Sequence, residues 1–277
     1  MSAPHTFDQA IALAAQSGEA DGRYRGQTSP AYGNMVGPFG GVTAATVLHA
    51  VLRHPALLGE PVALTVNFAA ALADGPFTVE ARPVRTNRST QHWVLEIVQA
   101  DAQGLPTTVL TGTAVTAARR QTWSVDDEPM PQVPAPAAVP PREIPTTVQW
   151  VRRYDMRPVE GNIPAVWDGS GDASRSTLWV RDNPPRALDF LSLTALSDVF
   201  FPRVWLRRAQ PVPAGTVSMT VYFHAGSAQL AAVGSGWLLG QARAQALRNG
   251  FFDQTALLWS ESGELLVTTH QIVYYKE

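Results

Sequence analysis

Two halves of the sequence carry the same ordered set of patterns, and this internal repeat limits the possible folds more than any other feature. The segment LTVNFAA (64–70) resembles MTVYFHA (219–225), and both alternate apolar and polar residues as half-buried strands do. Upstream of each, an apolar helical run closes at a proline: VLHAVLRHP ends at Pro55, and ALSDVFFP ends at Pro202. The order of these patterns therefore indicates a duplicated unit.

A third pair of segments extends the repeat. DAQGLPTTVLTGTAV (101–115) and ESGELLVTTHQIV (261–273) each place a glycine-containing turn before a β-branched strand. All three matches occur in the same order, at offsets of about 147 to 159 residues. Each half then has a helix enclosed by antiparallel strands, so the expected fold class is α+β.

A proline-rich segment separates the halves. The run DDEPMPQVPAPAAVPPREIPTT covers residues 126–147. Prolines at this density interrupt helices and sheet ladders and favour extended polyproline geometry. We therefore expect an N-terminal domain over 1–120, a linker over 121–146, and a C-terminal domain over 147–277.

The periodicity predicts the elements of each half. In the first half we expect helices over 7–17 and 38–53, a strand near Tyr24, and strands over 61–69, 76–86, 91–100 and 107–117. In the second half we expect strands over 148–155 and 176–181, a helix over 187–200, and strands over 216–224, 236–249, 254–260 and 264–275.

The composition excludes several kinds of chemistry. The 277 residues include no cysteine, which excludes disulfides, zinc–thiolate sites and a cysteine nucleophile. The sequence contains neither a GxSxG elbow nor an HExxH motif, and we expect no metal or cofactor. A formal charge of −2 gives no reason to expect nucleic acid or an anionic membrane as partner. No apolar run reaches the roughly 20 residues of a membrane helix, so we expect a cytoplasmic protein.

One carboxylate occupies an unexpected position in the second predicted helix. Asp198 follows Leu188, Leu191 and Ala195 on a single apolar stripe, near the negative end of the helix dipole. Burial and dipole would both raise the pKa of Asp198, a cost that is typical of functional sites. An exposed, solvated helix end is an equally good interpretation of the spacing alone. Aligning the two closing prolines places Val51 opposite Asp198, which favours a single working site.

Polar residues on two strands could accompany Asp198. By alternation, Thr216 and Ser218 share a face of strand 216–224 with Thr220, Tyr222 and His224. Gln271 lies within VTTHQIVYY on the last strand. For any one of these residues alone, an exposed polar side chain without a functional role is the more common explanation.

The motif PFGG opens the first helix. Gly40 and Gly41 follow Phe39 at the positive end of the helix dipole, where backbone N–H groups lack helical partners. Those donors could stabilise an oxyanion, although the glycines could equally serve only close packing. The spacing does not match a nucleotide-binding loop. Arg82, Arg85 and Arg88 could contact phosphates or simply form a solvated edge.

Taken together, these motifs resemble the acyl-CoA thioesterase II-like proteins, which have a double hotdog fold. The resemblance rests on FGG opening the first helix, SDVFF late in the second, TVSMTVYFHA, and GELLVTTHQ near the C-terminus. It implies that Asp198, Thr216 and Gln271 correspond to the family's catalytic Asp, Thr and Gln in the C-terminal half. One departure is Thr65, at a strand position where many relatives carry a histidine.

The resemblance implies hydrolysis of an acyl-CoA to a free acid and CoA. Asp198 would act as general base on a water held by Thr216 and Gln271, while Phe39, Gly40, Gly41 and Ser218 would contact the substrate. A homodimer or homotetramer is expected. Two alternatives remain: a non-catalytic acyl-CoA or acyl-carrier binding protein, and a hotdog dehydratase or hydratase that pairs Asp198 with His224 or His270.

Overall fold

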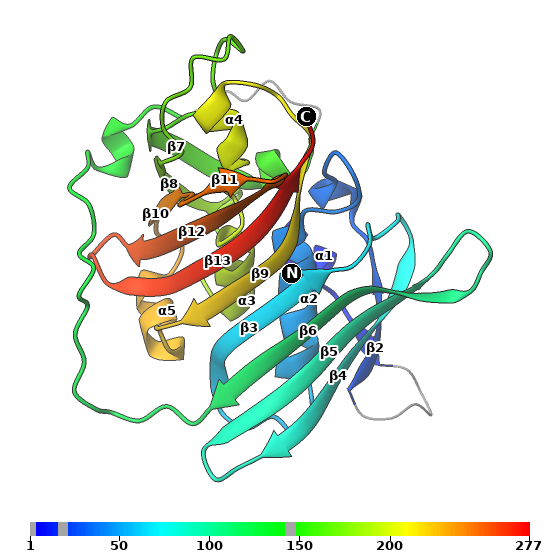
Figure 1. Cartoon of the computed structure of the whole chain (residues 1–277). Coiled ribbons are helices and arrows are strands. Elements are labelled where there is room, and N and C mark those ends of the chain that lie inside the picture. The colour runs from blue at the N-terminus through cyan, green and yellow to red at the C-terminus, as the bar shows by residue number, and fades with distance from the viewer. Residues whose placement is uncertain (1–3, 16–21, 142–147) are drawn as a thin grey trace.

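One antiparallel sheet runs through both halves of the chain (Figure 1). The structure is a computed structural model and describes residues 4–15, 22–141 and 148–277. The strands follow the order β1-β2-β4-β5-β6-β3-β9-β13-β12-β10-β8-β7, with the short β11 paired to β12. Strands β1 to β6 come from the first half of the chain, and β7 to β13 come from the second.

The first half contains a long central helix and the strands around it. Its elements are α1 (Thr6–Ala10), β1 (Ala14–Ala15), β2 (Arg23–Gln27), the 3-10 helix η1 (Pro30–Tyr32), α2 (Gly40–Leu52), β3 (Glu60–Phe68), β4 (Pro76–Thr86), β5 (Thr90–Ala100) and β6 (Pro106–Ala117).

The second half repeats this order with a shorter central helix. After the 3-10 helix η2 (Pro136–Ala138), its elements are η3 (Trp150–Arg153), β7 (Tyr154–Glu160), β8 (Ser176–Asp182), α3 (Phe190–Leu196), α4 (Arg203–Arg208), β9 (Ala214–Phe223), α5 (Ser227–Val233), β10 (Leu238–Arg243), β11 (Leu247–Arg248), β12 (Phe251–Ser260) and β13 (Leu265–Tyr275).

The two halves join at the β3–β9 pair. These strands are antiparallel, with a register that runs from Ala63 opposite Tyr222 to Asn67 opposite Ser218. At the middle of the junction Thr65 faces Thr220, and their hydroxyl oxygens lie 3.0 Å apart. Because this pairing uses the main chain of both halves, the sheet continues across the repeat boundary without an open edge.

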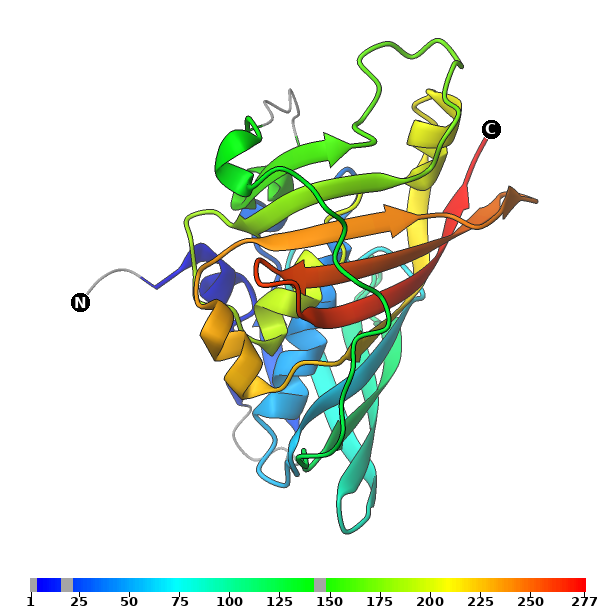
Figure 2. The same ribbon diagram turned by 90° about the vertical axis from the view of Figure 1, so that its left-hand side faces the viewer.

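Helices α2 and α3 pack against each other on the inner face of the sheet, as the turned view shows (Figure 2). Ten of the thirteen α2 residues are buried, so this helix is covered on nearly all sides. Its threonines tolerate burial because Thr43 and Thr46 donate hydrogen bonds back to the carbonyls of Phe39 and Val42. All seven α3 residues are buried as well.

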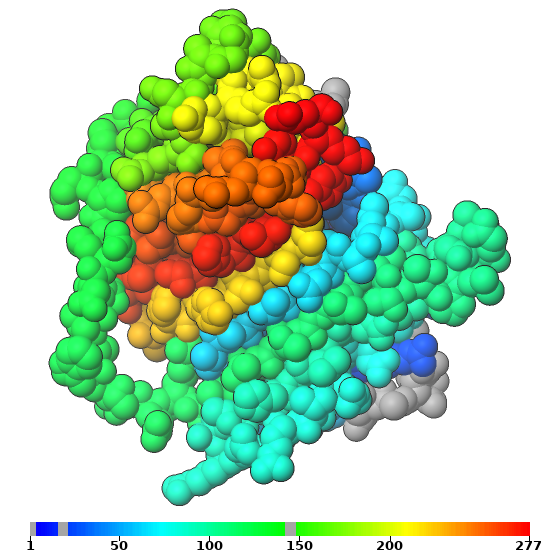
Figure 3. Space-filling model, in the orientation of Figure 1, coloured from blue at the N-terminus to red at the C-terminus, as the bar shows by residue number. Residues whose placement is uncertain are grey.

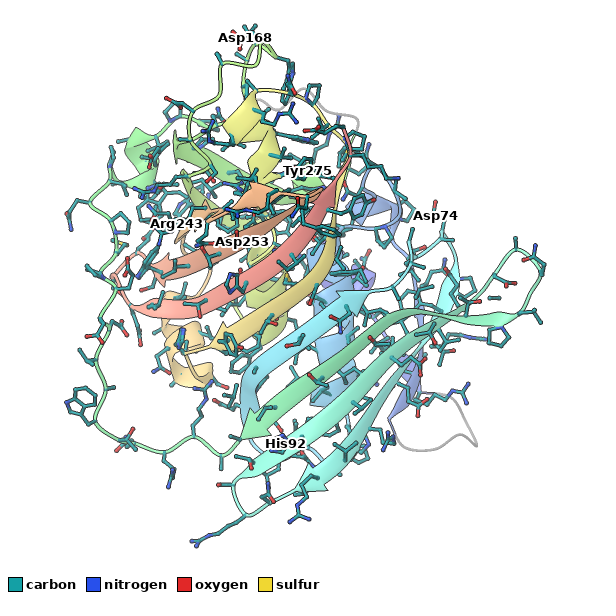
Figure 4. The ribbon with its side chains drawn as sticks, viewed as in Figure 1. Asp74, His92, Asp168, Arg243, Asp253 and Tyr275 are labelled. Carbon is teal, nitrogen blue, oxygen red and sulfur yellow. The ribbon has the colours of Figure 1, made fainter. Side chains whose placement is uncertain are left out.

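The opposite face of the sheet is open to solvent (Figure 3). His92 of β5 and Asp253 of β12 lie on this outer face (Figure 4). Strands such as β5 alternate exposed and buried residues, as expected for a sheet with one covered face. Among the described residues, no helix has both the length and the apolar character needed to cross a membrane.

Several predicted boundaries are wrong. The helix predicted over 7–17 ends at Ala10, and Ala14–Ala15 then pairs with β2 as strand β1, while residues 16 and 17 lie outside the described part. Residues 150–153 of the strand predicted over 148–155 form a 3-10 helix instead. The strand predicted over 236–249 is divided into β10 and β11, and the spacing did not predict α4 or α5.

The described part of the proline-rich segment runs along the outside of the second half (Figure 1). Met130, Val133 and Val139 pack against a small apolar cluster formed by Trp179, Trp237 and Leu239. The carbonyl of Pro134 accepts a hydrogen bond of 2.9 Å from the Trp179 indole. The division into domains 1–120 and 147–277 with a linker over 121–146 remains our proposal.

Candidate active site

Asp198 lies two residues beyond the end of α3. The side chain of Asp189 caps the helix by accepting from the backbone N–H of Ser192, and the helix ends at Leu196. The predicted helix over 187–200 is therefore too long at both ends. The Asp198 side chain is half-buried, and burial raises its pKa to about 7. A carboxylate with that pKa exchanges protons near neutral pH, as a general base must.

Gln271 connects Asp198 to Thr216. Its amide nitrogen donates a hydrogen bond of 2.8 Å to Oδ1 of Asp198, and its carbonyl oxygen accepts one of 3.2 Å from the Thr216 hydroxyl. Gln271 is only 3% exposed because it points from β13 to the inner face of the sheet. The structure thus brings together the three residues that the sequence motifs selected, from three separate elements.

A β-bulge turns Thr216 toward this site. In the β9–β13 pair, Ile272 faces Ser218 whereas Val273 faces Thr216, so β9 has one extra residue at this point. Thr216 therefore shares the inner face with Gln271, and Ser218 stays on the outer face with Ile272. The expectation from simple alternation that Thr216 and Ser218 share one face is wrong. Ser218 accordingly points away from Asp198.

The first turn of α2 completes the site. The backbone N–H of Gly41 is hydrogen-bonded to the Asp198 carboxylate, which partly offsets the effect of burial on its pKa. A Cβ atom on Gly40 would lie 2.8 Å from Oδ2 of Asp198, and one on Gly41 would lie 2.6 Å from the Ala195 carbonyl oxygen. Both glycines are therefore required for the close approach of α2 to the end of α3.

Phe39 packs beneath the site rather than lining an open surface. It is 2% exposed, and its ring stacks on Trp150 with a centroid distance of 4.3 Å. The pseudo-symmetric position of Asp198 is different in character: Val51 is fully buried near the C-terminal end of α2. That only one of the two half-sites works remains a prediction.

The histidines considered for a dehydratase lie away from Asp198. His270 alternates with Gln271 on β13 and faces outward, where it lies 3.7 Å from Asp253. His224 is exposed and pairs with the Thr268 hydroxyl at 3.0 Å.

The arginines Arg82, Arg85 and Arg88 are exposed around the β4–β5 hairpin, and a role in binding phosphates stays a prediction.

A surface groove of about 340 Å³ runs beside the edge strand β7, where Tyr154 and Asn183 contribute to its wall. Asp198, Thr216 and Gln271 do not line this groove.

The sequence motifs did not indicate three polar residues that lie near the stacked rings of Phe39 and Trp150: Tyr32, Tyr154 and Asp182. Each of them belongs to a different segment, and no spacing pattern could have linked them.

Two family models match the chain. The acyl-CoA thioesterase C-terminal domain matches residues 125–275, and the acyl-CoA thioesterase N-terminal domain matches residues 29–117. The chain belongs to the acyl-CoA thioesterase family. This thioesterase carries Asp198, Thr216 and Gln271 inside the C-terminal match. It is a thioester hydrolase, as the resemblance of its motifs implied.

Solved structures confirm the expected double hotdog fold of this thioesterase. A protein of unknown function with a hotdog fold from Alicyclobacillus acidocaldarius is 46% identical, with 99% of each chain covered and a TM-score of 0.92. The acyl-CoA thioesterase II TesB2 of Mycobacterium marinum is 18% identical, with 98% of each chain covered and a TM-score of 0.77. The tesB protein of Mycobacterium avium subs paratuberculosis is 18% identical, with 98% of each chain covered and a TM-score of 0.76. No match was found among curated proteins.

Proposed function

We propose that this thioesterase hydrolyses acyl-CoA by direct attack of water, with Asp198 as the general base. The observation that carries the proposal is the continuous chain of hydrogen bonds from Asp198 through Gln271 to Thr216. A carboxylate with a pKa of about 7 is half ionised near neutral pH and can both take and return a proton.

The geometry supports a defined role for each residue. Gln271 fixes one carboxylate oxygen, Oδ1, whereas Oδ2 lies close to Gly40, where a Cβ would be 2.8 Å away. The Thr216 hydroxyl uses its hydrogen on Gln271 and keeps a lone pair free to accept. A water between Oδ2 of Asp198 and Oγ1 of Thr216 could therefore donate to both while its oxygen faces the thioester carbon.

The reaction then proceeds in two steps. Water oxygen bonds to the thioester carbon as Asp198 takes one water proton, and the carbonyl oxygen becomes an oxyanion. The carbon–sulfur bond breaks when the oxyanion reforms its double bond, and the CoA thiolate receives the proton held by Asp198. Gly40, at the start of α2, offers a backbone N–H for the oxyanion, whereas the Gly41 N–H is already used by Asp198.

We also propose a homodimer or homotetramer that forms through the outer face of the sheet. Large apolar residues gather there on β12 and β13 with 39–49% of their surface exposed: Phe251, Ile272 and Tyr274, of which Phe251 and Tyr274 face each other in the strand pair. Such a contiguous apolar patch is typical of a protein interface. Light scattering coupled to size-exclusion chromatography measures the mass of the oligomer directly.

A cytoplasmic location of the protein stays a prediction.

Single-turnover hydrolysis in ¹⁸O-water tests the mechanism. With enzyme in excess over acyl-CoA, direct attack places one labelled oxygen in the product acid. If Asp198 instead attacked the carbon and water then opened the mixed anhydride at the Asp198 carboxyl carbon, the first turnover would transfer an unlabelled carboxylate oxygen. Release of free CoA thiol across a panel of acyl-CoA thioesters provides the steady-state measurement. An absence of thiol release from every acyl-CoA would contradict acyl-CoA as the substrate class.

A further inference from the structure

Three buried polar atoms near the candidate site make no hydrogen bond within the described residues: Oη of Tyr32, Oη of Tyr154 and Oδ1 of Asp182. The three residues are 0%, 4% and 3% exposed, respectively. A buried polar atom without a partner costs about 1–3 kcal/mol. Three such atoms in one region are therefore more informative than any one of them alone.

The backbone brings these three groups together. Tyr154 and Asp182 are directly opposite each other in the β7–β8 pair, so their side chains leave the same face of the sheet. The ring of Tyr32 meets the ring of Tyr154 edge to face, with centroids 6.3 Å apart. Ser192 of α3 donates to Oδ2 of Asp182 and fixes that carboxylate, which leaves Oδ1 as the open acceptor.

The cluster is next to the proposed catalytic residues. The ring of Tyr154 packs against Phe39 and Trp150, with centroid distances of 6.0 and 6.1 Å. Phe39 immediately precedes Gly40, whose missing Cβ allows α2 to approach Asp198 closely. Burial raises the pKa of Tyr154 well above its usual value, with smaller contributions from the charges of Tyr32, Asp182 and Asp198. Tyr154 therefore lies within electrostatic range of both acids.

The numbers of donors and acceptors match a ligand that carries a hydroxyl group. Both phenols stay protonated because burial raises the pKa of each, so they supply two O–H donors. The pKa of Asp182 is raised to about 6 by burial, and above that pH its Oδ1 supplies one acceptor. An alcohol or phenol hydroxyl has one hydrogen and two lone pairs, which match this set. A water makes the same three bonds with one hydrogen left over, and the substrate comparison below distinguishes it from a substrate hydroxyl. An ammonium offers no lone pair to the two phenols.

We propose that Tyr32, Tyr154 and Asp182 form a subsite for a hydroxyl group on the acyl chain, so that this thioesterase prefers hydroxyacyl-CoA substrates whose hydroxyl lies far from the thioester. The stacked rings of Phe39 and Trp150 lie between this cluster and the first turn of α2 and would make the path of the acyl chain apolar. The inference rests on the proposed function, because it assigns the far end of the same substrate.

Matched substrate pairs provide the test. We would compare kcat/KM for ω-hydroxyacyl-CoA thioesters of increasing chain length with their methyl-terminated counterparts, and for para-hydroxyphenylacetyl-CoA with phenylacetyl-CoA. A site that hydrogen-bonds a hydroxyl strongly rejects the analogue that lacks it. We expect at least one hydroxylated member to exceed its partner by about tenfold or more. Ratios near one for every pair would overturn the proposal.

Variants locate the preference. Tyr154→Phe removes only the hydroxyl, and Tyr32→Phe is the second choice if the first does not fold. Each should move the hydroxylated-to-plain ratio toward one by about tenfold. Tyr222→Phe, on the exposed outer face, is the matched control and should keep the wild-type ratio. An unchanged ratio in both Tyr154→Phe and Tyr32→Phe would show that the cluster holds only ordered water, and would overturn the proposal.

A binding measurement separates this inference from the proposed function. Calorimetric titration of Asp198→Asn with each substrate pair reports affinity without turnover. Stronger binding of the hydroxylated member, lost in the double variant with Tyr154→Phe, supports the subsite even if thiol release fails. Hydrolysis without any hydroxyl preference in binding or kinetics leaves the proposed function intact and contradicts the subsite.

Discussion

The amide nitrogen of Gln271 lies 2.8 Å from Oδ1 of Asp198 and donates to it, although the two residues are 73 positions apart in the chain. The bond favours the ionised carboxylate, whereas burial favours the protonated one. The balance leaves the Asp198 pKa near 7, and the behaviour of the site with pH and mutation depends on it.

Asp198→Asn should remove the base while keeping the shape of the side chain. We expect kcat to fall by about 10²–10⁴-fold, as is usual for the loss of a general base. The thiol-release rate at saturating substrate measures this, and thermal unfolding confirms that the variant is folded. A variant that keeps more than about a tenth of the wild-type kcat would exclude Asp198 as the base.

The pH dependence of kcat/KM should follow the ionisation of Asp198. Because the base must be deprotonated, kcat/KM should rise with pH and level off above about 7. Gln271→Leu removes a hydrogen bond that lowers the Asp198 pKa, so the midpoint should move to higher pH. Full pH profiles of both proteins give the two midpoints. Identical midpoints would show that Gln271 does not tune Asp198.

Asp198→Asn should also change stability in a pH-dependent way. The folded-state pKa of about 7 exceeds the unfolded value of 3.8, so the contribution of this group to stability is fully present below pH 3.8 and is lost as pH rises through 7. Asparagine does not titrate. The variant should therefore match wild type near pH 4 and be more stable by about 1–3 kcal/mol above pH 7. Denaturant unfolding at both pH values checks this, and a constant difference would contradict it.

Thr216 and Ser218 form a matched pair, since they lie on the same strand but on opposite faces. Thr216→Val removes the hydroxyl that orients Gln271, and the loss of one hydrogen bond should lower kcat by about threefold to tenfold. Ser218→Ala should leave kcat and KM unchanged. If Ser218→Ala lowered kcat as much as Thr216→Val, the assignment of faces at the bulge would be wrong.

Alanine at the two glycines should separate catalysis from stability. Gly40→Ala would place a Cβ 2.8 Å from Oδ2 of Asp198, so the flexible carboxylate must move. We expect about a 10²-fold lower kcat with little change in the melting temperature.

Gly41→Ala would meet the backbone oxygen of Ala195 at 2.6 Å, which cannot move without separating α2 from α3. That variant should lose about 1–3 kcal/mol of stability in denaturant unfolding. If Gly40→Ala were less stable and more active than Gly41→Ala, the assignment of Gly40 to catalysis and of Gly41 to helix packing would be wrong.

The sequence was sufficient to predict elements whose periodicity is long and regular. Helix α2 and strands β3 to β6 lie within a few residues of their predicted positions, because one face of each is buried over many residues. Helix α3 is too short for this signal. Its buried stripe continues past Leu196 into the turn that carries Asp198, so the pattern overestimates its length.

Alternation predicted a face for Thr216, but the bulge in β9 reversed it. A single inserted residue leaves no mark on apolar periodicity, and only the register of paired strands reveals it. Tyr32, Tyr154 and Asp182 were missed for a related reason. Each of them is ordinary within its own segment, and their lack of partners becomes visible only when distant segments are brought together in the fold.

The β3–β9 junction joins the two halves of the chain through the main chain of one sheet. One half contributes the glycine-rich helix start and the other contributes the carboxylate, so under the proposed mechanism neither half alone would form a complete site. Cutting the chain between them would also uncover two bare strand margins prone to mispairing. Under the proposed mechanism, exchange of a single half must preserve both the β3–β9 register and the close approach of Gly40 to Asp198.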